Sequence, residues 1–363
     1  MAVDVSLKAW LALSLMRGLG GESARRLLKE FGSPDAVFAA SVRSLKSVVK
    51  PEVATEISKG IIEDTVAPVM DWLEDSNNHA VTLADADYPQ ALLNIPDPPL
   101  LLYVKGRLDL LNRASLAIVG SRNATPQGIN NAEAFARSLS DAGLCIISGL
   151  AHGIDAAAHR GALKGQGSSV AIVGTGLDKV YPAANRDLAH ALAQQGTLVS
   201  EFPLGTPPLA ANFPRRNRLI SGMSAGCLVV EAGLQSGSLI TARMALDQGR
   251  DVFAIPGSIH SPQSKGCHAL LKQGAKLVET AQDILEELSG LPVSPARNTA
   301  AQGTDIQEPG FVLLEHLGFD PVDLDTLGKR SGLTVSQLSA MLLTLELEGR
   351  ISALPGGLYQ RIH

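Results

Sequence analysis

From Leu116 to about Leu288, short apolar or β-branched runs alternate with stretches of helical spacing. This alternation is typical of a doubly wound parallel sheet, in which a helix follows each buried strand. Ligands of such sheets bind at the carboxyl ends of the strands, near the point where the strand order reverses. The expected strands are Leu116–Val119, Leu144–Ile147, Ser169–Val173, Leu198–Val199, Cys227–Val230, Asp251–Ile255 and Lys276–Val278. The expected helices are Asn130–Asp141, Asp155–Leu163, Leu188–Gln195, Leu239–Gln248 and Cys267–Lys272.

The first part of the chain, from about Ser6 to Trp72, is expected to be helical because its apolar residues recur at helical spacing. Gly18-Leu19-Gly20 stands between the first two expected helices and resembles the turn of a helix-hairpin-helix unit. In that motif the glycines let backbone amides approach a phosphate closely. The alternative is a glycine that serves only close helix packing, so a DNA role for this turn stays open.

Three further segments flank the expected sheet. Tyr88–Gly106 is apolar and rich in proline, which is excluded from helix interiors, so an extended segment is expected. Ser289–Gly310 is rich in Pro, Ser, Ala, Gly and Gln without periodicity, and is expected to be a flexible linker. Phe311–His363 is expected to form two helices and a hairpin around Pro355-Gly-Gly, an order that resembles a winged helix.

The second helix of this tail, within Thr334–Gly349, is expected to be capped by Thr334, with Gln337 three residues later. In a winged helix that reads DNA, this helix carries basic residues that contact base edges. Here it contains no Lys or Arg and ends with Glu346 and Glu348. A role in protein interaction or as a scaffold is therefore favoured over DNA reading.

The length of 363 residues predicts two or three domains. The formal charge of -5 means that any nucleic-acid site must be a local patch. Cys145, Cys227 and Cys267 stand far apart and are expected to be buried thiols in a reducing compartment. The first residues lack a signal-peptide pattern and no apolar run is long enough to span a bilayer, so we expect a cytoplasmic protein without membrane contact.

The segment Leu116–Gly128 combines a strand, a tight glycine turn and a helix start. Thr125 is expected to cap the helix, with Pro126 at its first position. Free backbone amides and the helix dipole would point at one spot, which is suited to an anion. Arg122 adds a guanidinium there, so Gly120, Ser121 and Arg122 are expected to bind a phosphate.

The second candidate stretch is Phe213-Pro-Arg-Arg-Asn-Arg218. It lies in an interval, from Glu201 to Glu231, that contains three arginines and no acid. A ring that can stack on a base beside arginines that can contact phosphates is the combination used to bind single strands. The alternative is a solvated basic helix start.

Three other segments are expected to support an anion site. They are Thr125, the strand end Gly174-Thr175-Gly176, and the helix start Ser236-Gly237-Ser238. Glu231 is expected to be structural or to orient the arginines. An ion pair between Arg216 and Glu231, acting as an internal brace, is the alternative to a phosphate-binding role for Arg216.

Several enzyme classes lack their signatures in this sequence. There is no P-loop motif, and Lys179 stands where the third glycine of a dinucleotide fingerprint is required, which disfavours an NTPase and a dehydrogenase. Asp155 and His159, four residues apart, match no metal-binding pattern, so a hydrogen-bonded helix start is favoured over a metal site. We expect no catalytic residue, no metal and no cofactor.

Taken together, these stretches resemble the DNA processing protein A family (DprA, also called Smf). The motifs that carry the resemblance run in order through residues 88–288: Tyr88-Pro with Asp97-Pro-Pro, Ala117-Ile-Val-Gly-Ser-Arg-Asn-Ala-Thr125, Ser148-Gly-Leu-Ala-His-Gly-Ile-Asp155 with Ala158-His159, Val173-Gly-Thr-Gly-Leu177 with Tyr181-Pro182, Ser200-Glu201, Phe213-Pro-Arg-Arg-Asn-Arg218, Ser236-Gly-Ser-Leu-Ile-Thr241, and Gly249-Arg-Asp-Val-Phe-Ala-Ile-Pro-Gly257.

The resemblance implies a homodimeric, non-catalytic protein that binds single-stranded DNA, protects incoming DNA in natural transformation and helps to load the RecA recombinase. It implies that DNA contacts come from Gly120, Ser121, Arg122, Phe213, Arg216, Asn217 and Arg218. Alanine at Arg122 or Arg218 is expected to weaken strand binding while the fold persists. Some members have a lysine just before the phenylalanine, where this chain has Leu209-Ala210-Ala-Asn212.

The implied architecture has four parts. Residues 1–78 form a helical, helix-hairpin-helix or SAM-like domain, residues 79–288 an extended Rossmann-like core, residues 289–310 a linker, and residues 311–363 a winged-helix-like domain. The rival function is a phosphoribohydrolase that cleaves nucleoside monophosphates on a similar core. Those families carry a Pro-Gly-Gly-x-Gly-Thr loop where this chain has Ser236-Gly-Ser-Leu-Ile-Thr241, so binding ranks above catalysis.

Overall fold

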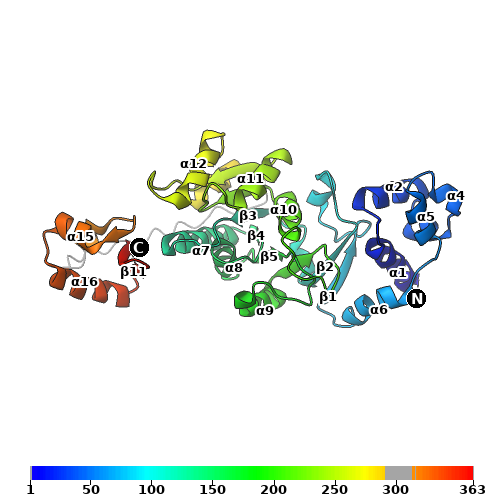
Figure 1. The fold of residues 1–363 in the computed structure, drawn as a ribbon, viewed down its shortest axis with the longest axis horizontal. Helices are drawn as coiled ribbons and strands as arrows, with labels where there is room; N and C mark the ends of the chain where they lie inside the picture. The colour runs from blue at the N-terminus through cyan, green and yellow to red at the C-terminus, as the bar shows by residue number, and fades with distance from the viewer. Residues whose placement is uncertain (1, 291–312, 315, 363) are drawn as a thin grey trace.

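A computed structural model describes residues 2–290, 313–314 and 316–362 of the chain. Figure 1 shows helices at the N-terminal end, a central sheet covered by helices, and a small C-terminal unit at the opposite end. Most of the linker predicted at 289–310 lies outside the described residues. Within them, no helix has both the length and the apolar character needed to cross a membrane.

The central sheet has nine strands in the order β1-β2-β6-β5-β4-β3-β7-β8-β9. Its parallel part runs from β6 to β9 and confirms the predicted doubly wound sheet. The chain builds outward from β3 in one direction and then returns to its other side with β7, so the strand order reverses between β3 and β7. The parallel strands are β3 (Ser115–Val119), β4 (Cys145–Ser148), β5 (Ser169–Ile172), β6 (Thr197–Ser200), β7 (Gly226–Val229), β8 (Asp251–Ala254) and β9 (Lys276–Leu277).

All five helices predicted between these strands are present, and the sheet also has an antiparallel edge that was not predicted. Residues 101–106, expected to be extended, form strand β2, which pairs antiparallel with β6 and with β1. These strands are β1 (Asn78–Thr82) and β2 (Leu101–Gly106). The predicted helices are α7 (Pro126–Asp141), α8 (Ile154–Ala162), α9 (Arg186–Gln195), α11 (Ser238–Asp247) and α12 (Lys265–Lys272). Helix α10 (Asn212–Gly222) was expected only as the alternative for its first residues, and α13 (Ala281–Glu287) was not predicted.

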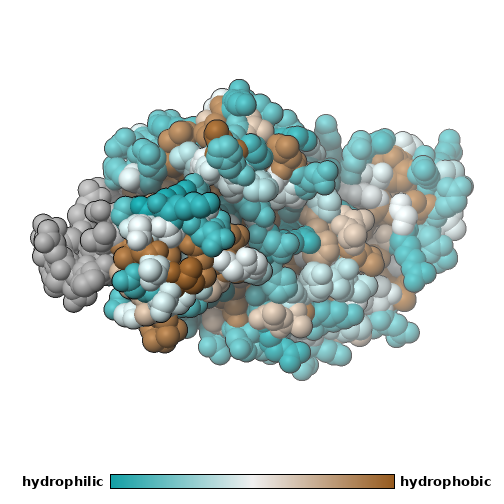
Figure 2. All heavy atoms as spheres, turned by 60° about the vertical axis from the view of Figure 1, so that its left-hand side comes forward, coloured by the Kyte–Doolittle hydropathy of each residue, from teal (hydrophilic) through white to brown (hydrophobic). Residues whose placement is uncertain are grey.

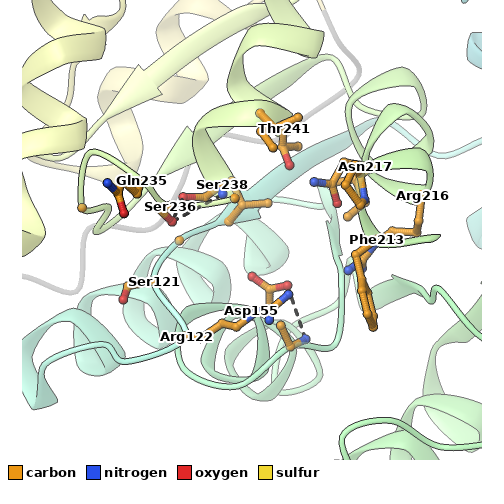
Figure 3. Close-up of a pocket in the computed structure, with 18 of the residues that line it drawn as sticks. Ser121, Arg122, Asp155, Phe213, Arg216, Asn217, Gln235, Ser236, Ser238 and Thr241 are labelled. Carbon is orange, nitrogen blue, oxygen red and sulfur yellow. Dashed lines mark hydrogen bonds between the residues drawn. The ribbon is translucent and has the colours of Figure 1, made fainter. Parts of the chain in front are cut away.

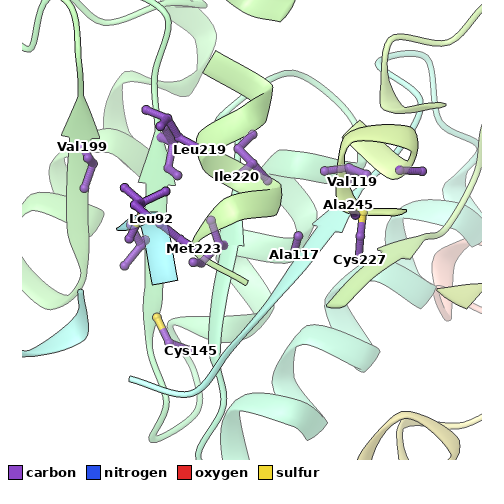
Figure 4. Packing of buried hydrophobic residues seen from close by; sticks show 14 of the residues in the cluster. Leu92, Ala117, Val119, Cys145, Val199, Leu219, Ile220, Met223, Cys227 and Ala245 are labelled. Atoms are coloured by element: carbon purple, nitrogen blue, oxygen red, sulfur yellow. The ribbon is translucent and has the colours of Figure 1, made fainter. Parts of the chain in front are cut away.

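The parallel strands are buried on both faces, as their continuous apolar runs predict. On one face, Leu219 and Ile220 of α10, with Met223 directly after it, pack in a cluster with alternate strand residues such as Ala117 and Val119 (Figure 4). Leu116 and Ile118 point to the other face, where α7 and α8 cover them. The three cysteines are buried free thiols, as predicted. This two-sided core fixes the loops at the carboxyl ends of β3 and β7.

The N-terminal segment is helical, as predicted. Gly18 has a φ of +80° in the turn between α1 and α2, a backbone conformation that favours glycine. Arg25 on α2 pairs with Asp97 at 2.8 Å and so connects these helices to the core. The helices are α1 (Ala2–Leu15), α2 (Gly21–Phe31), α3 (Pro34–Ala39), α4 (Val42–Leu45), α5 (Pro51–Ile57) and α6 (Glu63–Trp72).

The C-terminal unit has the predicted helices and hairpin, with Thr334 and Gln337 forming the expected capping box. Its helix α16 exposes Val335, Leu343 and Leu347, and Figure 2 shows apolar surface at this end of the molecule. The preference for protein interaction over DNA reading stays a prediction. The elements are β10 (Val322–Asp323), α15 (Leu324–Ser331), α16 (Val335–Leu347), β11 (Ile351–Leu354) and β12 (Leu358–Arg361).

Candidate nucleic-acid interface

A pocket of about 730 Å³ opens at the carboxyl ends of β3 and β7, where the strand order reverses. This is the position at which doubly wound sheets bind ligands. Figure 3 shows its walls, formed by the turn after β3, the start of α8, helix α10 and the loop before α11. The sequence-predicted residues that line it are Gly120, Ser121, Arg122, Phe213, Arg216, Asn217, Ser236, Gly237 and Ser238.

The turn after β3 is held by close backbone packing and by Glu231. A Cβ added to Gly120 would lie 2.6 Å from the Ile154 side chain and 2.8 Å from the Glu231 carbonyl oxygen, so the turn requires glycine. Thr125 caps α7 by accepting a hydrogen bond from the Gly128 amide at 3.0 Å, as predicted. The Glu231 carboxylate accepts hydrogen bonds from the Thr125 amide at 2.9 Å and from its hydroxyl at 2.6 Å. Glu231 is therefore structural, one of the two roles expected for it.

The Ser121 amide does not bind a phosphate in this geometry. It donates a hydrogen bond to the Glu231 carbonyl oxygen at 2.7 Å, so the expectation of a free amide at this position is wrong. Arg122 is exposed, and its guanidinium carbon lies 5.6 Å from the centre of the Phe213 ring. The group at this turn that can attract a phosphate is therefore the Arg122 guanidinium and not the Ser121 amide. The face of the Phe213 ring contacts this guanidinium.

Phe213 is part of an aromatic pair at the same wall. Its ring centre lies 5.6 Å from that of Tyr181, with an angle of 38° between the planes. Tyr181 is 45% exposed and lines the pocket, although the sequence did not single it out as a contact residue. A Cβ on Gly174 would lie 3.1 Å from Phe213, so that glycine makes room for the ring. The two rings together offer an accessible stacking surface.

Arg216 lies at the floor of the pocket and is 4% exposed. Its Nη1 donates to the Ile172 carbonyl oxygen at 2.6 Å, so the alternative ion pair with Glu231 does not form. Burial lowers the pKa of Arg216 to about 10, a value that leaves the side chain charged at neutral pH.

Asp155 and His159 form the hydrogen-bonded helix start that the sequence favoured. Asp155 accepts hydrogen bonds from the amides of Gly149 and Ala151, and His159 contacts the Ser169 hydroxyl and the Leu150 amide. Burial raises the pKa of Asp155, while the nearby Arg216 guanidinium opposes that rise. Within the described residues, no cluster of His, Cys, Asp and Glu could hold a metal ion.

Arg218 is separated from the pocket residues. Its guanidinium pairs with the Glu201 carboxylate and lies 3.5 Å from Asp97, and Arg215 also contacts Glu201, at 3.2 Å. The acid-free interval in the sequence therefore does not give a field of three free arginines, because two of them form ion pairs with Glu201. Arg218 faces the N-terminal side of the core, where Arg25 also pairs with Asp97.

The other predicted supporting residues lie outside the pocket lining. Thr125 acts as the cap of α7, and buried Thr175 donates to the Lys179 carbonyl oxygen at 3.2 Å. Gly174 packs against the Phe213 ring, and Gly176 packs against the Pro203 carbonyl oxygen. Pocket residues that the sequence did not predict as contacts include Asn123, Asp155, Tyr181, Gln235, Thr241 and Gln263. Asn123 and Gln235 follow β3 and β7 closely, which was the available signal, whereas Asp155 and Thr241 lie within α8 and α11.

His159 predicts a pH dependence of stability. Its side chain is fully buried, and burial lowers its pKa to about 3, with Arg216 and Arg160 acting in the same direction. Between pH 3 and the ordinary value of about 6.5, the unfolded chain binds a proton that the folded chain excludes. Stability is thus lost as the pH falls, by about 2 kcal/mol from this group between about pH 7 and pH 5.

Urea unfolding of the wild type and of His159→Gln at both pH values measures this contribution. The variant, which cannot gain the proton, should lose about 2 kcal/mol less than the wild type over that interval. Equal losses in the two proteins would show that His159 is not excluded from protonation in the folded state.

Comparisons with known proteins agree with this architecture. A family model described as "DNA recombination-mediator protein A" matches residues 79–289, and a "DprA winged helix domain" model matches residues 294–357. The chain is 40% identical to Protein Smf of Escherichia coli over 364 aligned residues, covering 97% of this chain and 95% of that protein.

Two solved structures are also similar. The X-ray structure of DNA processing protein A from Streptococcus pneumoniae aligns with a TM-score of 0.69 and 38% identity, covering 77% of this chain and 97% of that one. DNA processing protein A from Helicobacter pylori, described for its single-stranded DNA binding mode, aligns with a TM-score of 0.54 and 31% identity, covering 58% of this chain and 96% of that one.

Proposed function

Because this chain belongs to the DNA recombination-mediator protein A family, we propose that its pocket binds single-stranded DNA. The observation that carries the proposal is the pairing of an exposed guanidinium, Arg122, with the Phe213 ring at the pocket wall. A cation that neutralises phosphate beside a ring that stacks on a base is the combination used for single strands. The relative from Helicobacter pylori, described for the same activity, supports it.

Each wall of the pocket has a role in this proposal. Arg122 contacts the phosphate backbone at the rim, where its exposed side chain can follow the strand. Phe213 and Tyr181 stack on bases. Arg216 and Asn217 face the pocket from α10, and Ser236–Ser238 provide hydrogen-bonding groups on the opposite side. Arg218 acts indirectly, because its ion pair with Glu201 holds α10 in place.

The substitution Arg122→Ala tests this site. Because it removes one phosphate contact, affinity for single-stranded oligonucleotides should fall about tenfold, and the slope of log K against log salt should become shallower by about 1. Fluorescence anisotropy over a salt series measures both quantities, with duplex of equal length as the competing substrate. The wild type should prefer the single strand.

Arg137→Ala is the charge-matched control, since Arg137 lies on α7 with its side chain 62% exposed and does not line the pocket. It should leave affinity and salt slope close to the wild-type values. If Arg122→Ala bound DNA as the wild type does, with an unchanged salt slope, this pocket would not be the DNA site.

We further propose that DNA binding serves protection of incoming strands and loading of the RecA recombinase by a cytoplasmic homodimer. The family membership supports these steps, and the exposed apolar residues of α16 support contacts with another protein.

We propose no chemical step, because Glu231, the acid that a hydrolase would use as a base, already accepts two hydrogen bonds from Thr125. Residues 1–78, 79–288 and 311–363 are the proposed domains, with a linker at 289–310.

A further inference from the structure

The floor of the pocket holds two buried polar side chains with unused hydrogen-bonding capacity. Asp155, 7% exposed, uses its Oδ2 atom to accept from the amides of Gly149 at 3.1 Å and Ala151 at 3.4 Å. Its Oδ1 atom has no hydrogen-bond partner among the described residues. Arg216, 4% exposed, makes one hydrogen bond through Nη1, and its Nε is buried without a partner.

An unpaired buried donor such as Arg216 Nε is costly, and native proteins satisfy nearly all such groups, whereas the unpaired Oδ1 atom of Asp155 is not fully enclosed and is open to the pocket. Asp155 and Arg216 do not compensate each other by direct contact, since the ion pairs of the described residues join neither of them to a partner. Both line the pocket, and Figure 3 shows the Asp155 carboxylate between the turn after β3 and helix α10. A ligand in the pocket would therefore reach the two unpaired atoms that are not enclosed, Asp155 Oδ1 and the Nη2 group of Arg216.

The chemistry of this pair selects which part of a DNA strand reaches it. A phosphate is repelled by the Asp155 carboxylate, so phosphates are expected at the rim beside Arg122. The Watson–Crick edge of every nucleobase carries a donor next to an acceptor. A carboxylate oxygen accepts from the donor, and a guanidinium donates to the acceptor.

We propose that Asp155 determines what the pocket accepts, by taking a hydrogen bond from the Watson–Crick edge of one nucleobase while Arg216 donates to the adjacent acceptor. This inference rests on the proposed function and adds one requirement: the bound base must carry a hydrogen-bond donor next to an acceptor on its Watson–Crick edge. All four bases meet the requirement, so binding remains tolerant of sequence. A base analogue that lacks the edge donor does not meet it.

Adenine and unsubstituted purine (the base of nebularine) form a matched pair of probes, because they differ only in the exocyclic amino group. Anisotropy with oligonucleotides of equal length containing one or the other should show about tenfold weaker binding of the purine strand by the wild type, the loss expected for a hydrogen bond to a charged group. This comparison needs no variant and decides the proposal even if substitutions at Asp155 fail to fold.

The variant Asp155→Asn provides a second, independent test of this inference. The asparagine carbonyl can keep the bonds from Gly149 and Ala151, which turns its NH₂ group toward the pocket and replaces the acceptor by a donor. Its preference for adenine over purine should shrink to less than about twofold, because no acceptor remains to be satisfied. Asp187→Asn, an exposed change of equal charge on α9, should keep the wild-type preference.

The outcomes separate this inference from the proposed function. Failure of the wild type to bind any single strand would overturn the proposed function. Equal binding of the two strands by the wild type would overturn the role of Asp155 while leaving DNA binding intact. A full adenine preference that persists in folded Asp155→Asn would also overturn it, because another group would then read the amino donor.

Discussion

Arg218→Ala should lower the free energy of unfolding by about 3 to 5 kcal/mol, the cost of removing one partner from a buried ion pair. The Glu201 side chain is 3% exposed and that of Arg218 is 12% exposed, so little water is available to solvate the carboxylate that remains. Burial already raises the pKa of Glu201, and Arg218 is the strongest influence that opposes this rise. After the substitution, Glu201 would retain only its contact with Arg215 at 3.2 Å.

Arg215→Ala is the matched control, since both arginines lie on α10 and contact the same Oε2 atom of Glu201. The Arg215 side chain is 58% exposed, so its loss should cost less than about 1 kcal/mol. Urea unfolding at neutral pH measures both. Similar stabilities of the two variants would contradict the role assigned to Arg218, and would favour the original expectation that its loss affects DNA binding while the fold persists.

Gly153→Ala should destabilise the protein by about 3 kcal/mol or more and should also weaken single-strand binding. Gly153 precedes α8 with a φ of +73°, and an added Cβ would lie 2.3 Å from the Ser121 carbonyl oxygen and 2.7 Å from that of Arg122. The neighbouring Ile154 amide donates to the Ser121 carbonyl oxygen at 3.2 Å. The methyl group would therefore displace the turn that carries Arg122.

Gly249→Ala separates the clash from the backbone strain. Gly249 has a similar φ of +70°, but a Cβ there would meet nothing within 4 Å. It should cost only the strain of a positive φ, about 1 to 2 kcal/mol, and leave DNA binding unchanged. Thermal unfolding and anisotropy of the two variants test this. Equal destabilisation, with equal DNA binding, would show that contact with the Ser121–Arg122 turn is not what requires glycine at 153.

The elements that could be predicted from the sequence are those with a local cause. Seven parallel strands were predicted because each is an apolar run followed by glycine or a polar turn, and Thr125 and Thr334 were predicted as caps from their spacing. Strands β1 and β2 lack this pattern, since they lie before the alternation begins and pair antiparallel. Helix α10 was expected only as the alternative at this stretch, because Pro214 and the arginines obscure the apolar spacing of Leu219 and Ile220.

The amino-acid sequence by itself determined the sheet class, the position of the ligand site at strand ends, and nine of the residues that line it. Local patterns suffice there, because parallel strands align their carboxyl ends wherever the sheet forms. Only the tertiary structure decided the partner of each charge. It placed Arg216 under the pocket, Arg218 against Glu201, and Glu231 on Thr125, because hydrogen bonds and ion pairs depend on distances between segments far apart in the chain.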